Sequence, residues 1–395
     1  FDEAGKLLIA AKENTTDELE VIRMLQHLAR NRMLQGDFAR AAQEADEGVS
    51  RCENAKAEVL PLPLIAASYS MRGLCALHTQ DWDDAEEYLQ LASRWSQSPL
   101  THLVALHNLG CAHWALLEQD EQHEQRLRID SRQLSILHGK LWVGGGPVGE
   151  TEKLSSQDES SAREALGYWD EALEEALKGE GEGDPASAAS AMCGPMGGAA
   201  SMMGPEMQDT VRTVPAAQAG AGTVTKTKKS RIRSDDEILA ARLADCTFAV
   251  AYAATLCNTS IATGHLGNKS RATELLSSAL QALEAHKTDL RAQPMLGRVL
   301  SLVAYENMAN SNAVTAEGLF RASMEHLQSP YALSDQRWCH ELGITRGGYG
   351  VLLSKWDKRE ADSKRELAEG QRLVAESQAW AGGRAMPPSY LFPPL

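Results

Sequence analysis

Hydrophobic positions recur along this chain with the three-to-four-residue spacing of amphipathic helices, and sustained alternation typical of strands is missing. In the N-terminal part, this spacing predicts helix pairs over 18–35 and 39–54, 64–79 and 83–96, and 101–118 and 121–139. After an interruption, it predicts one long or two abutting helices over 236–265, and helices over 269–286, 293–310, 313–328, 335–354 and 357–379. The sequence therefore predicts an all-α protein.

Small residues mark a repeat within this helical pattern. They open the second helix of five pairs and stand about 44 residues apart on either side of the interruption: Ala41, Ala85, Ala272, Ala316 and Ala361. A further small residue precedes four of them by twelve positions: Ala29, Gly73, Ser260 and Ala304. Gly110 holds the same place in the third pair. Antiparallel helices that cross closely need small side chains at the crossing, so the pattern predicts repeated helical hairpins.

Several segments resemble the tetratricopeptide repeat (TPR) superfamily. QGDFARAAQEA, TQDWDDAEEYLQLA and LGNKSRATELLSSAL are similar to its turn and second helix, and LHNLGCAHWAL to its first helix. The resemblance covers about 17–139 and 236–380, and it implies a solenoid, a right-handed superhelix of antiparallel hairpins. The period departs from the usual value of about 34, Tyr349 stands at a small-residue position, and the third pair lacks the turn motif. A generic helical bundle is the alternative.

The predicted pairs divide the chain into 17–139, an insertion over 140–235, a second array over 236–380 and a proline-rich tail over 381–395. The insertion holds a single acidic helix over 160–178, a linker over 185–225 and a basic run over 226–233. Because the linker has no leucine, isoleucine or aromatic residue, we expect it to be disordered. This layout resembles the family of mitochondrial TPR proteins associated with respiratory complex III. That resemblance implies a role in assembly or maintenance of the complex.

Composition narrows the classes of function. The net charge of −15 argues against a nucleic-acid backbone as the main partner. Seven scattered cysteines without CxxC spacing indicate reduced thiols inside the cell. The resemblance to the complex III-associated family implies the mitochondrion in preference to the cytoplasm. The longest strongly apolar stretch covers only about ten residues, whereas a membrane span needs roughly 20, so we expect no transmembrane segment. Since the chain begins with Phe1, we expect a processed or truncated form without its targeting peptide.

Candidate chemistry is sparse. The sequence contains neither GxSxG nor HExxH. His107, Cys111 and His113 lie close together, but no second Cys/His cluster stands nearby to complete a metal site. The segment 264–270 lacks the GxxxxGK[ST] spacing of a phosphate-binding loop. We therefore expect no enzyme activity, no metal and no cofactor.

In the TPR register, the first helix of each pair lines a concave face. That register predicts a partner-binding groove of ten residues, of which we expect about half to be accessible: Arg30, Met33, Leu74, Leu77, His107, Cys111, Trp114, Ile261, Tyr305 and Met308. The Lys/Asn set with which chaperone-binding members clamp a peptide carboxylate is not present at the matching places. Trp114 is the candidate anchor for a partner. Alternatively, it fills the space between the second and third pairs.

These observations predict a non-enzymatic scaffold for protein–protein interaction, an accessory or assembly subunit of a larger complex. An RNA-binding helical-repeat protein of an organellar ribonucleoprotein is the alternative, although the acidic charge and the long period count against it. An enzyme on a helical scaffold would need a deep pocket with strongly shifted pKa values.

Limited proteolysis of the native protein is expected to cut first within 185–225, because a linker without a core cannot resist local unfolding. Mass spectrometry of the early products should identify two helical fragments. Equal resistance along the whole chain would contradict the predicted linker.

Overall fold

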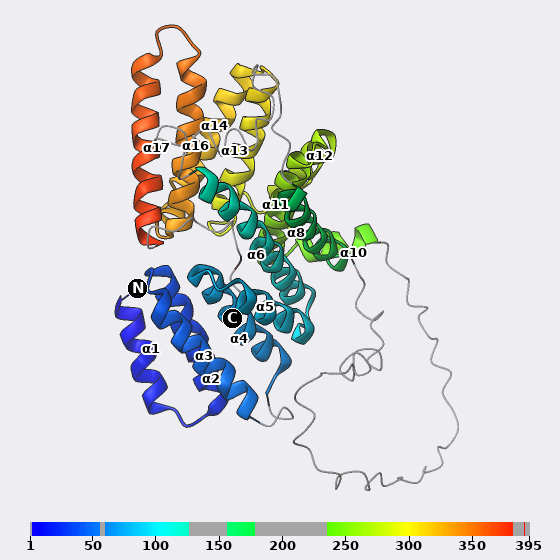
Figure 1. The fold of residues 1–395 in the computed structure, drawn as a ribbon, viewed down its shortest axis with the longest axis vertical. Helices are drawn as coiled ribbons and strands as arrows, with labels where there is room; N and C mark the ends of the chain where they lie inside the picture. Colours follow the sequence, from blue (N-terminus) through cyan, green and yellow to red (C-terminus); the bar gives the residue numbers. More distant parts are fainter. Residues whose placement is uncertain (1, 56–59, 126–155, 178–234, 382–390, 392–395) are drawn as a thin grey trace, which may run out of the picture. The chain divides into compact units, whose positions relative to one another are not determined.

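The computed structural model describes residues 2–55, 60–125, 156–177, 235–381 and 391. These residues form fifteen α-helices and contain no β-strand. The chain divides into two compact units, Phe1–Ala176 with Ala240–Leu395, and Leu177–Leu239. Within the first unit, helices pack mainly against their neighbours in the chain as hairpin-like pairs (Figure 1). The predicted all-α class and the helical pairing are therefore confirmed.

The N-terminal helices agree with the sequence pattern to within two residues at each end. They are α2 (Glu18–Leu34), α3 (Phe38–Asn54), α4 (Leu62–Thr79) and α5 (Trp82–Trp95). A further helix, α1 (Asp2–Asn14), was not predicted. It packs against α2, and Lys12 Nζ lies 2.6 Å from Glu47 Oε2 of α3.

The third pair differs from the prediction. Instead of turning near residue 120, α6 (Pro99–Gln125) continues as one helix, and residues 126–139 lie outside the described part of the chain. The second-helix place is taken by α8 (Ser156–Glu175), which packs along α6. The single helix predicted over 160–178 is therefore present, but it packs along α6 instead of standing apart from the pairs. Its buried stripe explains why: Ala162, Ala165, Trp169 and Ala172 repeat at helical spacing.

Eight helices follow in the C-terminal part. They are α10 (Asp235–Leu243), α11 (Cys246–His265), α12 (Lys269–Glu284), α13 (Gln293–Ala309), α14 (Ala313–Leu327), α15 (Pro330–Leu333), α16 (Gln336–Ser354) and α17 (Glu360–Trp380). The stretch 236–265 thus forms two helices. In the part of the chain that the structure describes, no single helix has the length and apolarity to cross a membrane. The joined segments Glu237–Leu243 and Cys246–His265 meet those two criteria only together, with a bend of 111°. The predicted linker 185–225 and basic run 226–233 lie outside the described residues.

Four hairpin turns share one backbone design. In each, the first of the two residues before the second helix adopts a positive φ, between 63° and 87°: Gly36, Gln80, Gly267 and Ser311. The next residue precedes the second helix, and its N–H donates to the carbonyl oxygen five residues earlier at 2.8–3.0 Å: Asp37, Asp81, Asn268 and Asn312. Glycine suits the first place because it lacks a Cβ, and Asp or Asn suits the second as a helix N-cap. The recurrence of this turn supports the repeat inferred from the sequence.

Small residues lie at the helix crossings, as the repeat requires. The predicted anchors Ala41, Ala85, Ala272 and Ala316 are all buried. A Cβ added at Gly73 would lie 2.7 Å from Leu89 Cγ, and one at Gly297 would lie 2.8 Å from Leu327 Cγ. Ser260 serves in another way, because its hydroxyl donates to the Ala272 carbonyl oxygen at 2.8 Å and ties the two helices together.

The predicted anchor of the last pair, Ala361, is wrong, because this residue is exposed. Ser363 takes its place: its hydroxyl donates to the Gly350 carbonyl oxygen at 2.8 Å. The turn before α17 is two residues longer than the turn before α14, which shifts the register. Tyr349 therefore does not stand at the small-residue position, and its hydroxyl lies 3.1 Å from Glu317 Oε1.

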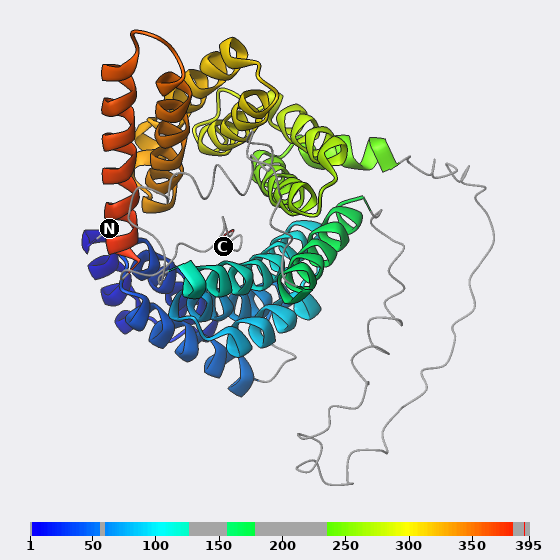
Figure 2. The same ribbon diagram turned by 45° about the horizontal axis from the view of Figure 1, so that its top comes forward.

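The last helix also contacts the first pair (Figure 2). Trp380 Nε1–H donates to the Leu34 carbonyl oxygen at 3.2 Å. Its ring stands edge-on to Phe38, with centroids 5.2 Å apart, in the favourable T-shaped arrangement.

The α6–α8 crossing can be tested at Gly110. A Cβ there would lie 2.6 Å from Trp169 Cδ1, so Gly110→Ala is expected to destabilise the protein by about 1–3 kcal/mol through overpacking. Gly167 of α8 is the matched control, since a Cβ at this exposed helical position meets no atom within 4 Å. Gly167→Ala is expected to raise stability by about 0.5–1 kcal/mol. Urea denaturation of both variants measures the difference, and equal midpoints would contradict the pairing of α6 with α8.

Candidate functional site

A buried polar cluster joins α6 to α11. His107 Nδ1 lies 3.0 Å from Thr255 Oγ1. Because the Thr255 hydroxyl already donates its hydrogen to the Ala251 carbonyl oxygen at 3.0 Å, His107 must be the donor. His107 Nε2 is then an acceptor, and it lies 3.5 Å from Asn258 Nδ2. The same amide nitrogen lies 3.4 Å from Cys111 Sγ. The cluster thus brings together two predicted groove residues, His107 and Cys111.

Arg298 of α13 extends the polar cluster toward α16. Its Nη2 donates to Asn258 Oδ1 at 2.9 Å, and its Nε lies 3.4 Å from Glu341 Oε1. The Arg298 side chain is only 5% exposed. Its buried Nη1 has no hydrogen-bond partner among the described residues. A buried donor without an acceptor costs about 1–3 kcal/mol, so this atom lowers the net stabilisation that the cluster provides.

Asn108, beside His107 on α6, holds a segment from the far end of the chain. Its Nδ2 donates to the Leu391 carbonyl oxygen at 2.8 Å, and its Oδ1 accepts from the Leu391 N–H at 2.9 Å. Asn108 itself is fully buried. One side chain therefore satisfies both backbone groups of a single residue 283 positions away. We call this arrangement the Asn108 clamp.

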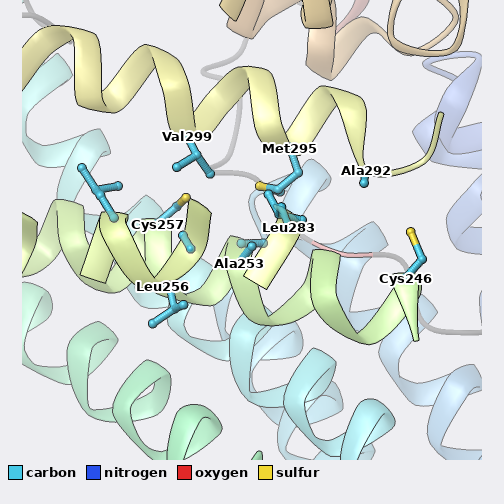
Figure 3. Close-up of a cluster of buried hydrophobic side chains, with 11 residues drawn as sticks. Cys246, Ala253, Leu256, Cys257, Leu283, Ala292, Met295 and Val299 are labelled. Carbon is cyan, nitrogen blue, oxygen red and sulfur yellow. The ribbon is translucent and has the colours of Figure 1, made fainter. Parts of the chain in front are cut away.

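The Leu391 side chain packs against the apolar cluster that α11, α12 and α13 share. Figure 3 shows this cluster, with Val299 of α13 beside Cys257 of α11 and Met295 of α13 beside Leu283 of α12. Burial raises the pKa of the Cys257 thiol to about 12, so at neutral pH it is a protonated packing group. The surface that meets Leu391 is thus apolar, and the polar contacts come from Asn108.

The ten predicted groove residues differ in accessibility. Seven are buried: Met33, Leu74, Leu77, His107, Cys111, Trp114 and Tyr305. Three are partly accessible: Arg30, Ile261 and Met308. Cys111, Trp114 and Ile261 share one apolar cluster, whereas Tyr305 and Met308 belong to another.

His113 stands apart from the polar cluster. Its Nδ1 lies 3.2 Å from Glu164 Oε2 of α8, and its ring lies 5.0 Å from that of Tyr168. Within the described ranges, no group of three Cys, His, Asp or Glu side chains is placed to hold a metal ion. His107 and Cys111 instead contact Asn258 of α11, and His113 contacts Glu164 of α8.

Five residues of the polar cluster and the clamp were not predicted from the sequence: Asn108, Thr255, Asn258, Arg298 and Glu341. The sequence contains one indication that two of them are buried. Asn258 directly follows the longest apolar run, and Arg298 lies inside a second apolar run. A polar side chain at such a place has to find a partner in the interior. The identity of that partner required the fold.

Trp114 packs between α6, α8 and α11. It is only 4% exposed, and its ring centroid lies 5.9 Å from that of Trp169 and 5.2 Å from that of His265. Trp114→Ala is therefore expected to lower stability by about 3–5 kcal/mol. The control Tyr331→Ala, at an exposed position, should stay within about 0.5 kcal/mol of the parent protein. Thermal and urea melting measure both. An unchanged Trp114→Ala melting curve with loss of a bound partner would instead support the anchor role.

No family model and no curated protein matches this chain. The structure shows that the described residues form helices, which pack mainly as sequential pairs.

Proposed function

We propose that this chain is a non-enzymatic scaffold of the tetratricopeptide type, which binds an extended segment of a protein partner at the Asn108 clamp. The observation that carries the proposal is the pair of hydrogen bonds between the Asn108 amide and the backbone of Leu391. The repeated turns and the small residues at the helix crossings support the tetratricopeptide assignment.

The chemistry of the clamp favours an extended ligand. A side-chain amide that pairs with both the N–H and the C=O of one residue needs a residue whose backbone groups are not already used in a helix. In peptide recognition of this kind, main-chain hydrogen bonds supply affinity and neighbouring side-chain contacts supply specificity. Because Asn108 is buried, water competes little for its amide.

The described cysteines support the non-enzymatic part of the proposal, since all six are buried and burial raises the thiol pKa of Cys75 and Cys257 to about 12. A thiol of this kind is a poor nucleophile at neutral pH.

The layout resemblance suggests which larger assembly contains the partner. Three helix pairs, an insertion and three further pairs are similar to mitochondrial TPR proteins associated with respiratory complex III. We therefore propose that the chain is an accessory or assembly subunit of such a complex, and subunits of the respiratory chain are the first partners to test.

The test compares partner capture by the parent protein and by Asn108→Leu, which keeps nearly the same shape and removes the amide. Two hydrogen bonds of about 1 kcal/mol each predict a loss of roughly 30-fold in affinity. Co-purification in mild detergent with quantitative mass spectrometry measures the loss, and melting curves verify that the variant is folded.

Asn310→Leu is the matched control, because Asn310 is exposed at the end of α13. It should capture the same proteins as the parent. Equal capture by Asn108→Leu and the parent would contradict binding at the clamp. Capture that disappears on nuclease treatment would favour the RNA-binding alternative.

A further inference from the structure

We propose that the C-terminal segment of this chain, through Leu391, is a built-in competitor for the partner at the Asn108 clamp. This inference rests on the proposed function and adds its regulation and the chemistry of the partner. In the resting chain, Leu391 occupies the clamp, and a partner peptide binds by displacing it.

Asn108 binds Leu391 through its backbone, in the way that a protein binds an extended peptide ligand. Its contacts with Asn108 use backbone atoms only, and they form between residues 283 positions apart. Leu391 is itself only partly buried, whereas Asn108 is fully buried. Asn108 is therefore the enclosed partner of this contact, and Leu391 is the residue that solvent and a competing peptide can reach.

Only a short stretch of chain connects α17 to Leu391 and tethers this residue near the clamp. Helix α17 ends at Trp380. Ten residues after Ala381 can span at most roughly 33–36 Å. An occupant on such a short tether reaches an effective concentration on the order of millimolar. A weak intrinsic interaction is then enough to keep the clamp occupied until a tighter partner arrives.

The sequence around Leu391 is rich in proline. The segment 386–395 reads MPPSYLFPPL, with prolines at 387, 388, 393 and 394. Proline disfavours helix both at its own position and at the residue before it. Prolines at these places disfavour a helix through Leu391, and this agrees with the pairing of both its N–H and its C=O with Asn108.

These contacts define the partner that can displace the tail. The residue at the clamp must supply an N–H, which excludes proline, and it must be apolar, because it replaces Leu391 on the cluster that contains Met295 and Val299. The partner is therefore an extended peptide with an aliphatic residue at this place and no helix through it. A tail that serves only as a permanent structural strap is the competing explanation.

The experiment uses the full-length chain and a fluorescent peptide of residues 386–395, with binding followed by anisotropy. In the parent protein, the tethered segment should keep the peptide affinity low. In full-length Leu391→Glu, whose tail no longer fits the apolar cluster, the affinity should rise by about tenfold or more. Asn108→Leu added to Leu391→Glu should abolish this gain.

A modified peptide isolates the clamp without altering the protein. Replacing the leucine that corresponds to Leu391 by N-methyl-leucine keeps its side chain and removes its N–H, so binding to full-length Leu391→Glu should fall by about tenfold. Equal peptide affinity for the parent and Leu391→Glu, or no binding to either, would overturn the competitor proposal and leave a structural strap. The scaffold function has a separate readout, since it fails only if Asn108→Leu captures partners as well as the parent does.

Discussion

The paired helices of this protein cross so closely that only small side chains fit at the crossings. At Gly73 and Gly297 a single added Cβ would lie within 2.8 Å of a leucine on the partner helix. Interiors packed this tightly transmit strain instead of absorbing it. At the α6–α8 crossing, Trp169 lies against Gly110 and donates to the His107 carbonyl oxygen at 3.0 Å. The same crossing therefore holds the turn of α6 that carries His107 and Asn108.

The polar cluster is unusual in a core that is mostly apolar. Burying Arg298 is costly, and its contacts with Asn258 and Glu341 offset only part of that cost. Apolar residues of similar volume often stabilise a core as well, so we interpret the cluster as a means of selecting one arrangement of α6, α11, α13 and α16. Each hydrogen bond in it requires a defined register between helices that are distant in sequence.

The packing between helix pairs explains why the predicted groove residues differ from the proposed site at Asn108. The register of the repeat correctly identified the first helices, and it placed His107 and Cys111 near the centre of the array. It could not separate side chains that pack between pairs, such as Trp114, from a side chain that faces another segment. Asn108 was passed over because nothing in its immediate sequence indicates a partner at Leu391.

Local sequence was sufficient for the helices and for the turns between them. Glycine at 36 and 267 accommodates positive φ, Asp37 and Asn268 cap the following helix, and the three-to-four-residue spacing selects the buried face. Packing in three dimensions was needed to assign α8 to α6, to move the last anchor from Ala361 to Ser363, and to bring Asn108 to Leu391. The physical reason is the difference in sequence separation. Helix caps and hydrophobic periodicity depend on residues a few positions apart, whereas these contacts depend on the geometry of every turn between the two residues.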